Sequence, residues 1–109
     1  MKGRVTKATD ISARTRHKVY VRDGGCCIIC GSPFDLQVAH YVSRSQLGLG
    51  IEQNLVLLCN GCHYSFDNGG KREEYGKMIA DYLRAWYKNW DGMKLTYEKW
   101  SESDGTETK

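Results

Sequence analysis

The sequence lacks a long apolar segment. No stretch approaches the roughly 18 consecutive apolar residues that a membrane-spanning helix needs, and the first twenty residues lack the apolar core of a secretory signal. We therefore expect a cytoplasmic protein without a membrane partner. The five cysteines are an odd number, which argues against a framework made of disulfides alone. In a reducing cytosol, Cys-x-x-Cys pairs usually bind a metal ion.

The middle of the chain has little positive charge. Residues 23–69 contain one basic residue, Arg44, against four acidic ones, whereas residues 1–22 contain seven lysines and arginines against Asp10 alone. The formal net charge of the whole chain is +3. A basic N-terminal part beside a near-neutral body indicates either a polyanionic partner such as a nucleic acid or a merely solvated N-terminus.

Two helices are predicted at the ends of the chain, beside segments without apolar pattern. Residues 1–10 are predicted to form a loose basic arm, and Ser12 can cap a helix that runs to about Arg22. Residues 73–90 place apolar and aromatic side chains at the 3.6-residue period, which predicts a longer amphipathic helix. Residues 101–109 are predicted to be disordered.

Short apolar segments lie between the two helices. Residues 36–42 and 55–58 are too short for helices and rich in β-formers, so they predict two strands. A short helix is predicted from about Asn60 to Phe66. With 109 residues the core must be thin, and a staple is expected. The sequence thus predicts a small α+β fold in a single domain, 1–109.

The cysteines form two Cys-x-x-Cys pairs, Cys27/Cys30 and Cys59/Cys62, that stand 28 residues apart. A two-residue spacer lets one turn present two sulfurs to one ion, and tetrahedral zinc accepts four thiolates. Gly31 suits such a turn, where a positive φ is often needed. The doubled motif predicts a structural zinc site, although iron in the same cage and a redox-active dithiol also fit the spacing.

A zinc ion held by four thiolates would tie the turn before the first strand to the turn after the second. Its binding free energy would then contribute to folding. Such a closed site has no open coordination position, so it cannot be a catalytic metal. Cys26 interrupts the pattern and is predicted to be a spare thiol.

Four polar residues near the cysteines form a second pattern: His40, Asn54, His63 and Asp67. His40 lies near the end of the first predicted strand, and Asn54 precedes the second. His63 and Asp67 stand at i and i+4, which presents both to one side of a helix. A neutral imidazole can accept a proton near pH 7, and His with Asp can hold a divalent ion.

With these residues, the stretch from Arg22 to about Asn68 resembles the HNH (ββα-metal) endonuclease family, specifically members with a four-cysteine zinc site around the catalytic hairpin and helix. The segments that carry the resemblance are RDGGCCIICG, VAHYVSRSQLG and NLVLLCNGCH. The resemblance implies a ββα-metal core at residues 22–68. It also implies a metal-dependent DNA endonuclease that hydrolyses phosphodiester bonds to leave a 5′-phosphate and a 3′-hydroxyl.

The resemblance implies a role for each residue of the second pattern. His40 would be the general base that takes a proton from the attacking water, and Asn54 would orient the backbone or the imidazole of His40 across the hairpin. His63 would bind a single catalytic divalent ion, with Asp67 as a second ligand. The expected ion is Mg²⁺ or Mn²⁺, with Ni²⁺ or Zn²⁺ as alternatives.

Ala39 departs from the family pattern, because that position usually carries a metal-binding Asp or His. The ion would then have His63 and Asp67 as its evident protein ligands, with Gln37 or Asn68 as further candidates. An alternative function follows from this departure. The protein would be a zinc-stabilised nucleic-acid-binding or adaptor module with a degenerate HNH site.

DNA is the expected partner, bound mainly through its phosphates. The predicted contacts are basic residues outside the cysteine segments: Arg14, Arg16, Lys18, Arg22, Arg44, Lys71 and Arg72. Small proteins that look like this one occur in bacteria and their phages, often close to genome-packaging genes. The resemblance therefore implies the cytoplasm of a bacterial host cell, and phage packaging or other DNA-processing proteins as candidate partners.

Overall fold

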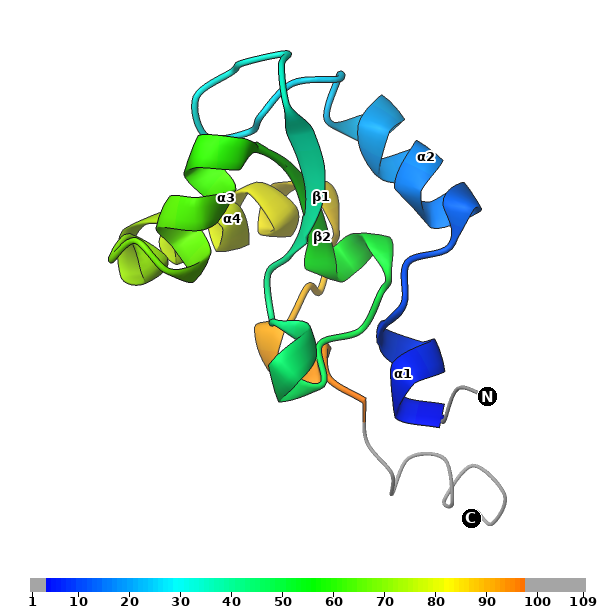
Figure 1. The fold of residues 1–109 in the computed structure, drawn as a ribbon. Helices are drawn as coiled ribbons and strands as arrows, with labels where there is room; N and C mark the ends of the chain where they lie inside the picture. The colour runs from blue at the N-terminus through cyan, green and yellow to red at the C-terminus, as the bar shows by residue number, and fades with distance from the viewer. Residues whose placement is uncertain (1–3, 98–109) are drawn as a thin grey trace, which may run out of the picture.

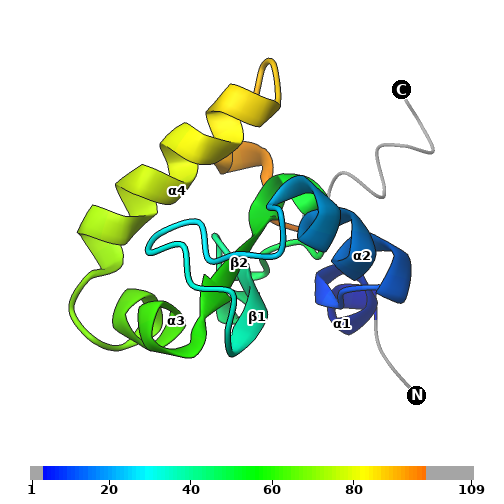
Figure 2. The same ribbon diagram turned by 90° about the horizontal axis from the view of Figure 1, so that it is seen from above.

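The computed structural model describes residues 4–97, and the side chains from residue 7 onward. Helices α1 (Arg4–Thr9) and α2 (Ala13–Arg22) precede strand β1 (Leu36–His40), and β2 (Leu55–Cys59), α3 (Asn60–Asp67) and α4 (Arg72–Trp86) follow it. Three short 3₁₀ helices are η1 (Arg44–Gln46), η2 (Glu52–Asn54) and η3 (Gly92–Lys94). The two strands pair antiparallel, with Val38 opposite Leu57. Figures 1 and 2 show the hairpin between α2 on one side and α3 with α4 on the other.

Helix α2 begins and ends where its sequence predicts. The Ser12 hydroxyl accepts a hydrogen bond from the Thr15 backbone N–H at 3.1 Å, which satisfies one free donor of the first turn. Gly24 and Gly25 both have a φ of +68°, a conformation that glycine adopts without steric cost. Val19 is fully buried against the hairpin. The prediction of a helix from Ser12 to Arg22 is confirmed.

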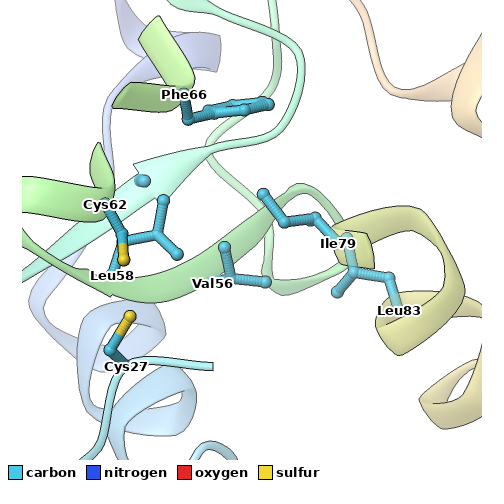
Figure 3. Close-up of a cluster of buried hydrophobic side chains, with 8 residues drawn as sticks. Cys27, Val56, Leu58, Cys62, Phe66, Ile79 and Leu83 are labelled. Atoms are coloured by element: carbon cyan, nitrogen blue, oxygen red, sulfur yellow. The ribbon is translucent and has the colours of Figure 1, made fainter. Parts of the chain in front are cut away.

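The hairpin is covered on both faces, which explains why the second strand is a continuous apolar run. Leu55 and Leu57 pack with Val19 on the α2 side, whereas Val56 and Leu58 pack on the side of α3 and α4. Successive side chains of a strand point to opposite faces, so a strand buried on both faces has no polar alternation. Figure 3 shows Val56 and Leu58 between Ile79 and Leu83 of α4 on one side and the two cysteines Cys27 and Cys62 on the other.

Helix α4 is shorter than its sequence pattern predicts. Ile79, Ala80 and Leu83 are its buried residues, but the helix ends at Trp86 and not near residue 90. The Trp90 indole N–H donates to the carbonyl oxygen of Gln53 at 2.7 Å, outside the helix. The aromatic periodicity therefore continues past the helix end, because Trp90 packs through the loop that follows.

The N-terminal segment differs from the predicted loose arm. Residues Arg4–Thr9 are helical, and the Gly50 backbone N–H donates to the Ala8 carbonyl oxygen at 3.0 Å. Thr9 is 3% exposed. The arm is therefore docked on the loop between the strands. The tail predicted to be disordered, 101–109, lies outside the described residues. Within residues 4–97, no helix combines the length and the apolar character needed to cross a membrane.

Candidate active site and metal centre

The four paired cysteines converge on one point. Their Sγ atoms all lie within 4.8 Å of one another, and those of Cys30 and Cys59 are 3.6 Å apart. Tetrahedral zinc with Zn–S bonds of about 2.3 Å separates its sulfurs by about 3.8 Å. In Figure 3 the sulfurs of Cys27 and Cys62 point toward one another at one end of the apolar core. The cluster thus has the size and the donor atoms of a structural zinc site, and Cys26 is not part of it.

The local backbone supports each cysteine pair. The Cys30 N–H points to the Cys27 sulfur at 3.5 Å, and the Cys62 N–H to the Cys59 sulfur at 3.4 Å. Gly31 has a φ of +83°, as its place after the second cysteine predicts.

The electrostatics of the cluster favour a cation among the four sulfurs. Burial opposes ionisation of Cys27, but backbone N–H groups outweigh it and lower the pKa of that thiol to about 7. Burial and the neighbouring thiols raise the pKa of Cys62. Four thiolates this close repel one another, so a bound divalent ion is what would let all four ionise.

His40 is the last residue of β1 and is held by the N-terminal segment. Its Nε2 lies 3.0 Å from the Thr9 carbonyl oxygen. A carbonyl oxygen can only accept, so Nε2 carries the proton of the neutral ring, and the lone pair is on Nδ1. Burial lowers the pKa of His40 below its ordinary value, an effect that the Thr9 carbonyl opposes and the charge of Arg44 reinforces. His40 is therefore a neutral base with a defined tautomer at pH 7.

Asn54 is fully buried and fastens the loop that follows His40. Its Oδ1 accepts from the Val42 N–H at 2.8 Å, and its Nδ2 donates to the carbonyl oxygens of Val42 at 3.1 Å and Leu49 at 2.8 Å. Its own carbonyl accepts from the Tyr41 N–H. Of the two roles that the resemblance implies, these contacts fit orientation of the backbone beside His40.

His63 and Asp67 lie on one side of α3, with His63 Nε2 2.9 Å from Asp67 Oδ2. The other ring nitrogen, Nδ1, contacts Oε1 of Gln37, and Gln37 Nε2 donates to Asn60 Oδ1 at 3.1 Å. An amide oxygen can only accept, so a neutral His63 has its lone pair on Nε2, facing the carboxylate. Two such electron-pair donors repel unless they share a cation, which can be a proton on Nε2 or a metal ion.

The spacing of these two donors fits a divalent ion. Two neighbouring ligands of an octahedral ion at about 2.1 Å lie about 3.0 Å apart, close to the observed 2.9 Å. Gln37 was a candidate ligand from the sequence. The structure gives it a different contact, because it holds the His63 ring from the side opposite to Asp67.

One hollow of about 410 Å³ gathers these groups. It is lined by His40, His63, Asp67, Arg16, Arg44 and Ser43, with Ile11 and Val38. We call it the His40 hollow. Arg44 forms an ion pair with Asp10 at 2.5 Å. Two of the predicted DNA contacts, Arg16 and Arg44, thus lie beside the candidate base and metal ligands.

Arg22 does not lie on the predicted DNA surface. Its side chain is 6% exposed, and its guanidinium donates to Asp23, to the carbonyl oxygens of Glu52 and Leu55, and to the Tyr87 hydroxyl. All five N–H groups of the guanidinium are used inside the protein. The prediction of a phosphate contact at Arg22 is therefore wrong.

Among the remaining basic residues of α2, Arg16 lines the His40 hollow, whereas Arg14 and Lys18 do not. Lys18 Nζ lies 3.6 Å from Glu52 Oε2. Arg14 and Lys18 are exposed and share the face of α2 that carries Arg22, because they stand at i, i+4 and i+8. Arg16 stands on another face and lines the hollow.

Ala39 is 1% exposed and packs in the apolar cluster with Phe66 and Cys62. It shares its face of β1 with Gln37, the residue that reaches His63. Position 39 therefore adds to the core and supplies no ligand.

Residues 27–68 match the sequence profile of the HNH endonuclease family. These residues form an HNH endonuclease domain. The match begins at Cys27 and ends one residue after Asp67, so it contains the cysteine cluster and the His63/Asp67 pair.

One solved structure supports the fold of this HNH domain. The chain is similar to the Type IV phosphorothioation-dependent restriction endonuclease ScoMcrA, with a TM-score of 0.63 and 23% sequence identity. The similarity covers 77% of this chain and 21% of that chain, so this chain spans about a fifth of the length of that protein. Among the curated proteins, none matches the chain.

Proposed function

We propose that the HNH domain is a metal-dependent DNA endonuclease that hydrolyses phosphodiester bonds. One observation carries the proposal. The unprotonated nitrogen of His40 and the facing donors of His63 and Asp67 belong to residues that line a single hollow. A base beside two metal ligands is the arrangement that activates water at a phosphate.

His40 acts as the general base through Nδ1. The Thr9 carbonyl holds the proton on Nε2, so the ring does not need to change tautomer before it takes a proton from water. Because burial lowers the pKa of His40, the neutral form persists at pH values below the ordinary range of histidine.

His63 and Asp67 hold the catalytic divalent ion. Mg²⁺ or Mn²⁺ suits the carboxylate, and the imidazole also suits Ni²⁺ or Zn²⁺. When bound, the ion neutralises charge that develops on the phosphate and on the leaving 3′-oxygen. Gln37 positions the His63 ring, and Asn54 fastens the loop beside His40.

The four cysteines hold a zinc ion that has a structural role. Cys27 and Cys30 lie in the turn before β1, and Cys59 and Cys62 lie where β2 joins α3. A closed zinc site between these turns fixes α3 against the hairpin. It thereby sets His63 beside His40 without taking part in cleavage.

DNA binds mainly through its phosphates, with Arg16 and Arg44 at the His40 hollow and the exposed Arg14 and Lys18 on another face of α2. The HNH family and the printed name of the similar restriction endonuclease support DNA as the substrate. A bacterial cytoplasm, and phage packaging or other DNA-processing partners, remain predictions from resemblance.

The adaptor function is the second candidate, and the buried Ala39 favours it because the ion loses one ligand of the family pattern. Incubation of supercoiled plasmid with the protein and Mg²⁺, Mn²⁺, Ni²⁺ or Zn²⁺ separates the two. We expect nicked or linear DNA that disappears with His40→Ala and persists with His17→Ala, a matched histidine that does not line the His40 hollow. Intact plasmid with every metal, with DNA binding retained, would favour the adaptor.

A further inference from the structure

A second hollow, of about 570 Å³, lies between α4, the end of α3 and the segment after α4. In Figure 2 the chain turns back after α4 toward the hairpin. We call this hollow the aromatic cleft. It is lined by aromatic residues, three cations and two glycines: Tyr41, Phe66, Trp90, Arg72, Lys77, Arg84, Gly76 and Gly92, with Val42, Glu73 and Met93. Its volume falls within the range of roughly 300–1,000 Å³ typical of ligand sites.

Two glycines keep the cleft open. Gly76 lies inside α4, where its φ is not left-handed and glycine weakens the helix. A Cβ atom at Gly76 would lie 3.5 Å from Cε1 of Phe66, and one at Gly92 would lie 3.3 Å from Cη2 of Trp90. The backbone does not require glycine at either position. Their shared effect is free space above the aromatic side chains.

The aromatic side chains form a fixed platform. The rings of Tyr41 and Trp90 meet edge to face, with centroids 5.6 Å apart and an angle of 63° between the planes. Trp90 is anchored by its indole N–H on the Gln53 carbonyl. Arg84 lies 5.4 Å over the Trp90 ring, and Arg72 lies 4.1 Å over the buried ring of Phe66. Half-buried rings beside guanidinium groups suit a planar, electron-rich ligand.

The lining of the cleft favours an anion. Three cations, Arg72, Lys77 and Arg84, line it against Glu73 alone, a surplus of two positive charges among the lining residues. Two carboxylates outside that lining also pair with these cations, Asp81 with Arg84 at 2.8 Å and Asp67 with Arg72 at 3.6 Å. Arg72 also donates to the Tyr41 carbonyl oxygen at 3.1 Å, so its guanidinium is held at the edge of the platform. Aromatic rings with surplus positive charge match a nucleobase that carries its phosphate.

A third hollow lies between the aromatic cleft and the His40 hollow and shares lining residues with both. It has a volume of about 380 Å³ and shares Ser43 and Asp67 with the His40 hollow and Arg72 with the aromatic cleft. Arg72 Nη1 lies 3.6 Å from Asp67 Oδ1. A nucleic-acid strand at the candidate catalytic site can therefore reach the cleft across the Ser43–Gln46 segment.

We propose that the aromatic cleft binds one unpaired nucleotide of the DNA strand that lies in the His40 hollow. The base stacks on the face of one ring, Tyr41 or Trp90, and meets the edge of the other, because the two rings stand at 63° to each other. Its phosphate contacts the cations. The nucleotide must be unpaired, because a base in a duplex is already stacked on both faces. The inference rests on the proposed function, and it names the substrate class as DNA with a single-stranded segment beside the cut site.

The test is a comparison of single-stranded and duplex binding. Fluorescence anisotropy with an eight-nucleotide oligothymidylate and with a blunt hairpin duplex, without added divalent ion, gives the two dissociation constants. Gly76→Leu fills the cleft and should weaken oligothymidylate binding about tenfold, as loss of a base stack does, with duplex binding within about twofold. Ala85→Leu is the matched control. It adds the same side chain at an exposed position of α4 that lines no described hollow, and it should change neither constant.

Stability separates a blocked cleft from a damaged fold. Replacing a helix-interior glycine should raise the melting temperature. Gly76→Ala, whose methyl group has ordinary contact distances, should therefore be more stable than the wild type and bind oligothymidylate more weakly. Unchanged oligothymidylate affinity in both Gly76 variants would overturn the inference, as would an equal loss for oligothymidylate and duplex.

Two further experiments complete the test. The first distinguishes a nucleotide within a DNA strand from a free nucleotide, and the second distinguishes failure of the cleft from failure of the proposed endonuclease. Thymidine monophosphate should compete with oligothymidylate only at concentrations far above the oligonucleotide; competition at equal concentrations would overturn a strand-bound nucleotide. If plasmid is never cleaved but the Gly76 variants lose oligothymidylate selectively, the endonuclease fails and the cleft stands. If plasmid is cleaved and Gly76→Leu cuts a flap-bearing duplex as fast as wild type does, the cleft fails and the endonuclease stands.

Discussion

The two candidate metal centres of this chain are built in opposite ways. The four cysteines lie in two short turns and one end of the apolar core, and all four ligands of the closed site come from the paired motif. The His63/Asp67 pair opens into a hollow and depends on Gln37 from β1, while its neighbour His40 depends on Thr9 from α1. The proposed structural site is closed and complete with its four cysteines, whereas the proposed catalytic site is open and needs contacts from two other elements to orient its histidines.

The largest expected effect is on the closed centre. Cys59→Ser removes one thiolate and should abolish zinc binding and cooperative folding, since metal-binding free energy is folding free energy here. Circular dichroism and metal content by mass spectrometry measure both. Cys26→Ser, which leaves the cluster intact, should keep one zinc per chain and the wild-type melting temperature. A folded, zinc-loaded Cys59→Ser protein would remove the distinction between the centres.

Arg22→Ala should have the next largest effect, a loss of folding stability. It leaves Asp23 buried without its cationic partner, which typically costs about 3–5 kcal/mol, and it also frees the Tyr87 hydroxyl and two carbonyl oxygens. Urea denaturation measures the loss. A loss of DNA affinity with unchanged stability would instead restore Arg22 to the DNA surface.

Gln37→Ala should lower activity without unfolding the chain. Outer contacts of metal-binding histidines are typically worth 10–100-fold in affinity or activity, and the exposed Gln37 lies outside the core. Plasmid nicking as a function of Mn²⁺ concentration should shift to higher concentration. Partial recovery is expected with Gln37→Glu, whose carboxylate can accept from His63 Nδ1. Identical curves for wild type and Gln37→Ala would show that the ring needs no such support.

Gly50→Ala tests the long-range part of the open centre. A Cβ atom at Gly50 would lie 2.0 Å from the Asp10 carbonyl oxygen and 3.0 Å from that of Thr9, so α1 must move from its place beside His40. We expect kcat to fall about tenfold, a partial loss of the roughly 10²–10⁴-fold that a positioned general base contributes. Gly61→Ala is the control, because its methyl group would meet nothing within 4 Å.

The pH profile of the same pair sharpens the assignment. Burial is the main cause of the lowered pKa of His40, so undocking α1 should raise that pKa toward the ordinary value. The general base must be neutral, and activity falls as pH drops through the pKa. The acid limb of kcat/KM should therefore move to higher pH in Gly50→Ala and stay in place in Gly61→Ala. An acid limb at the same pH in both variants would mean that the docking of α1 does not change the pKa of His40.

Arg16→Ala is expected to have the smallest effect. It removes one phosphate contact at the His40 hollow, so DNA affinity should fall a few-fold for every sequence and the salt slope should shrink by about one. Anisotropy between 50 and 200 mM salt measures both (about the range in which phosphate contacts are lost). An unchanged salt dependence of the affinity would mean that the DNA phosphates do not contact Arg16.

Local patterns explain what the sequence could predict. The spacing of the cysteine pairs, the i, i+4 position of His63 and Asp67 and the apolar run of β2 each describe one turn or one element. Periodicity also predicted α4, although it extended the helix to residue 90. Trp90 keeps the period but packs on Gln53 outside the helix, and a pattern cannot tell these two ways of burying an aromatic ring apart.

Contacts between distant segments explain the features that the sequence could not predict. The Thr9 carbonyl that orients His40 is a backbone group and has no residue signature. Arg22 looks like the other arginines of α2, and its burial follows only from the tertiary position of Glu52, Leu55 and Tyr87. The docking of α1 depends on the absence of a side chain at Gly50, which reads as an ordinary loop glycine.

The most direct test of two centres with separate tasks is His63→Ala, assayed for zinc content, melting temperature and plasmid cleavage in one preparation. The variant should keep one zinc per chain and the melting temperature of the wild type within a few degrees, and it should lose cleavage with every divalent ion. Wild-type cleavage by His63→Ala, or loss of its zinc together with its fold, would contradict the account.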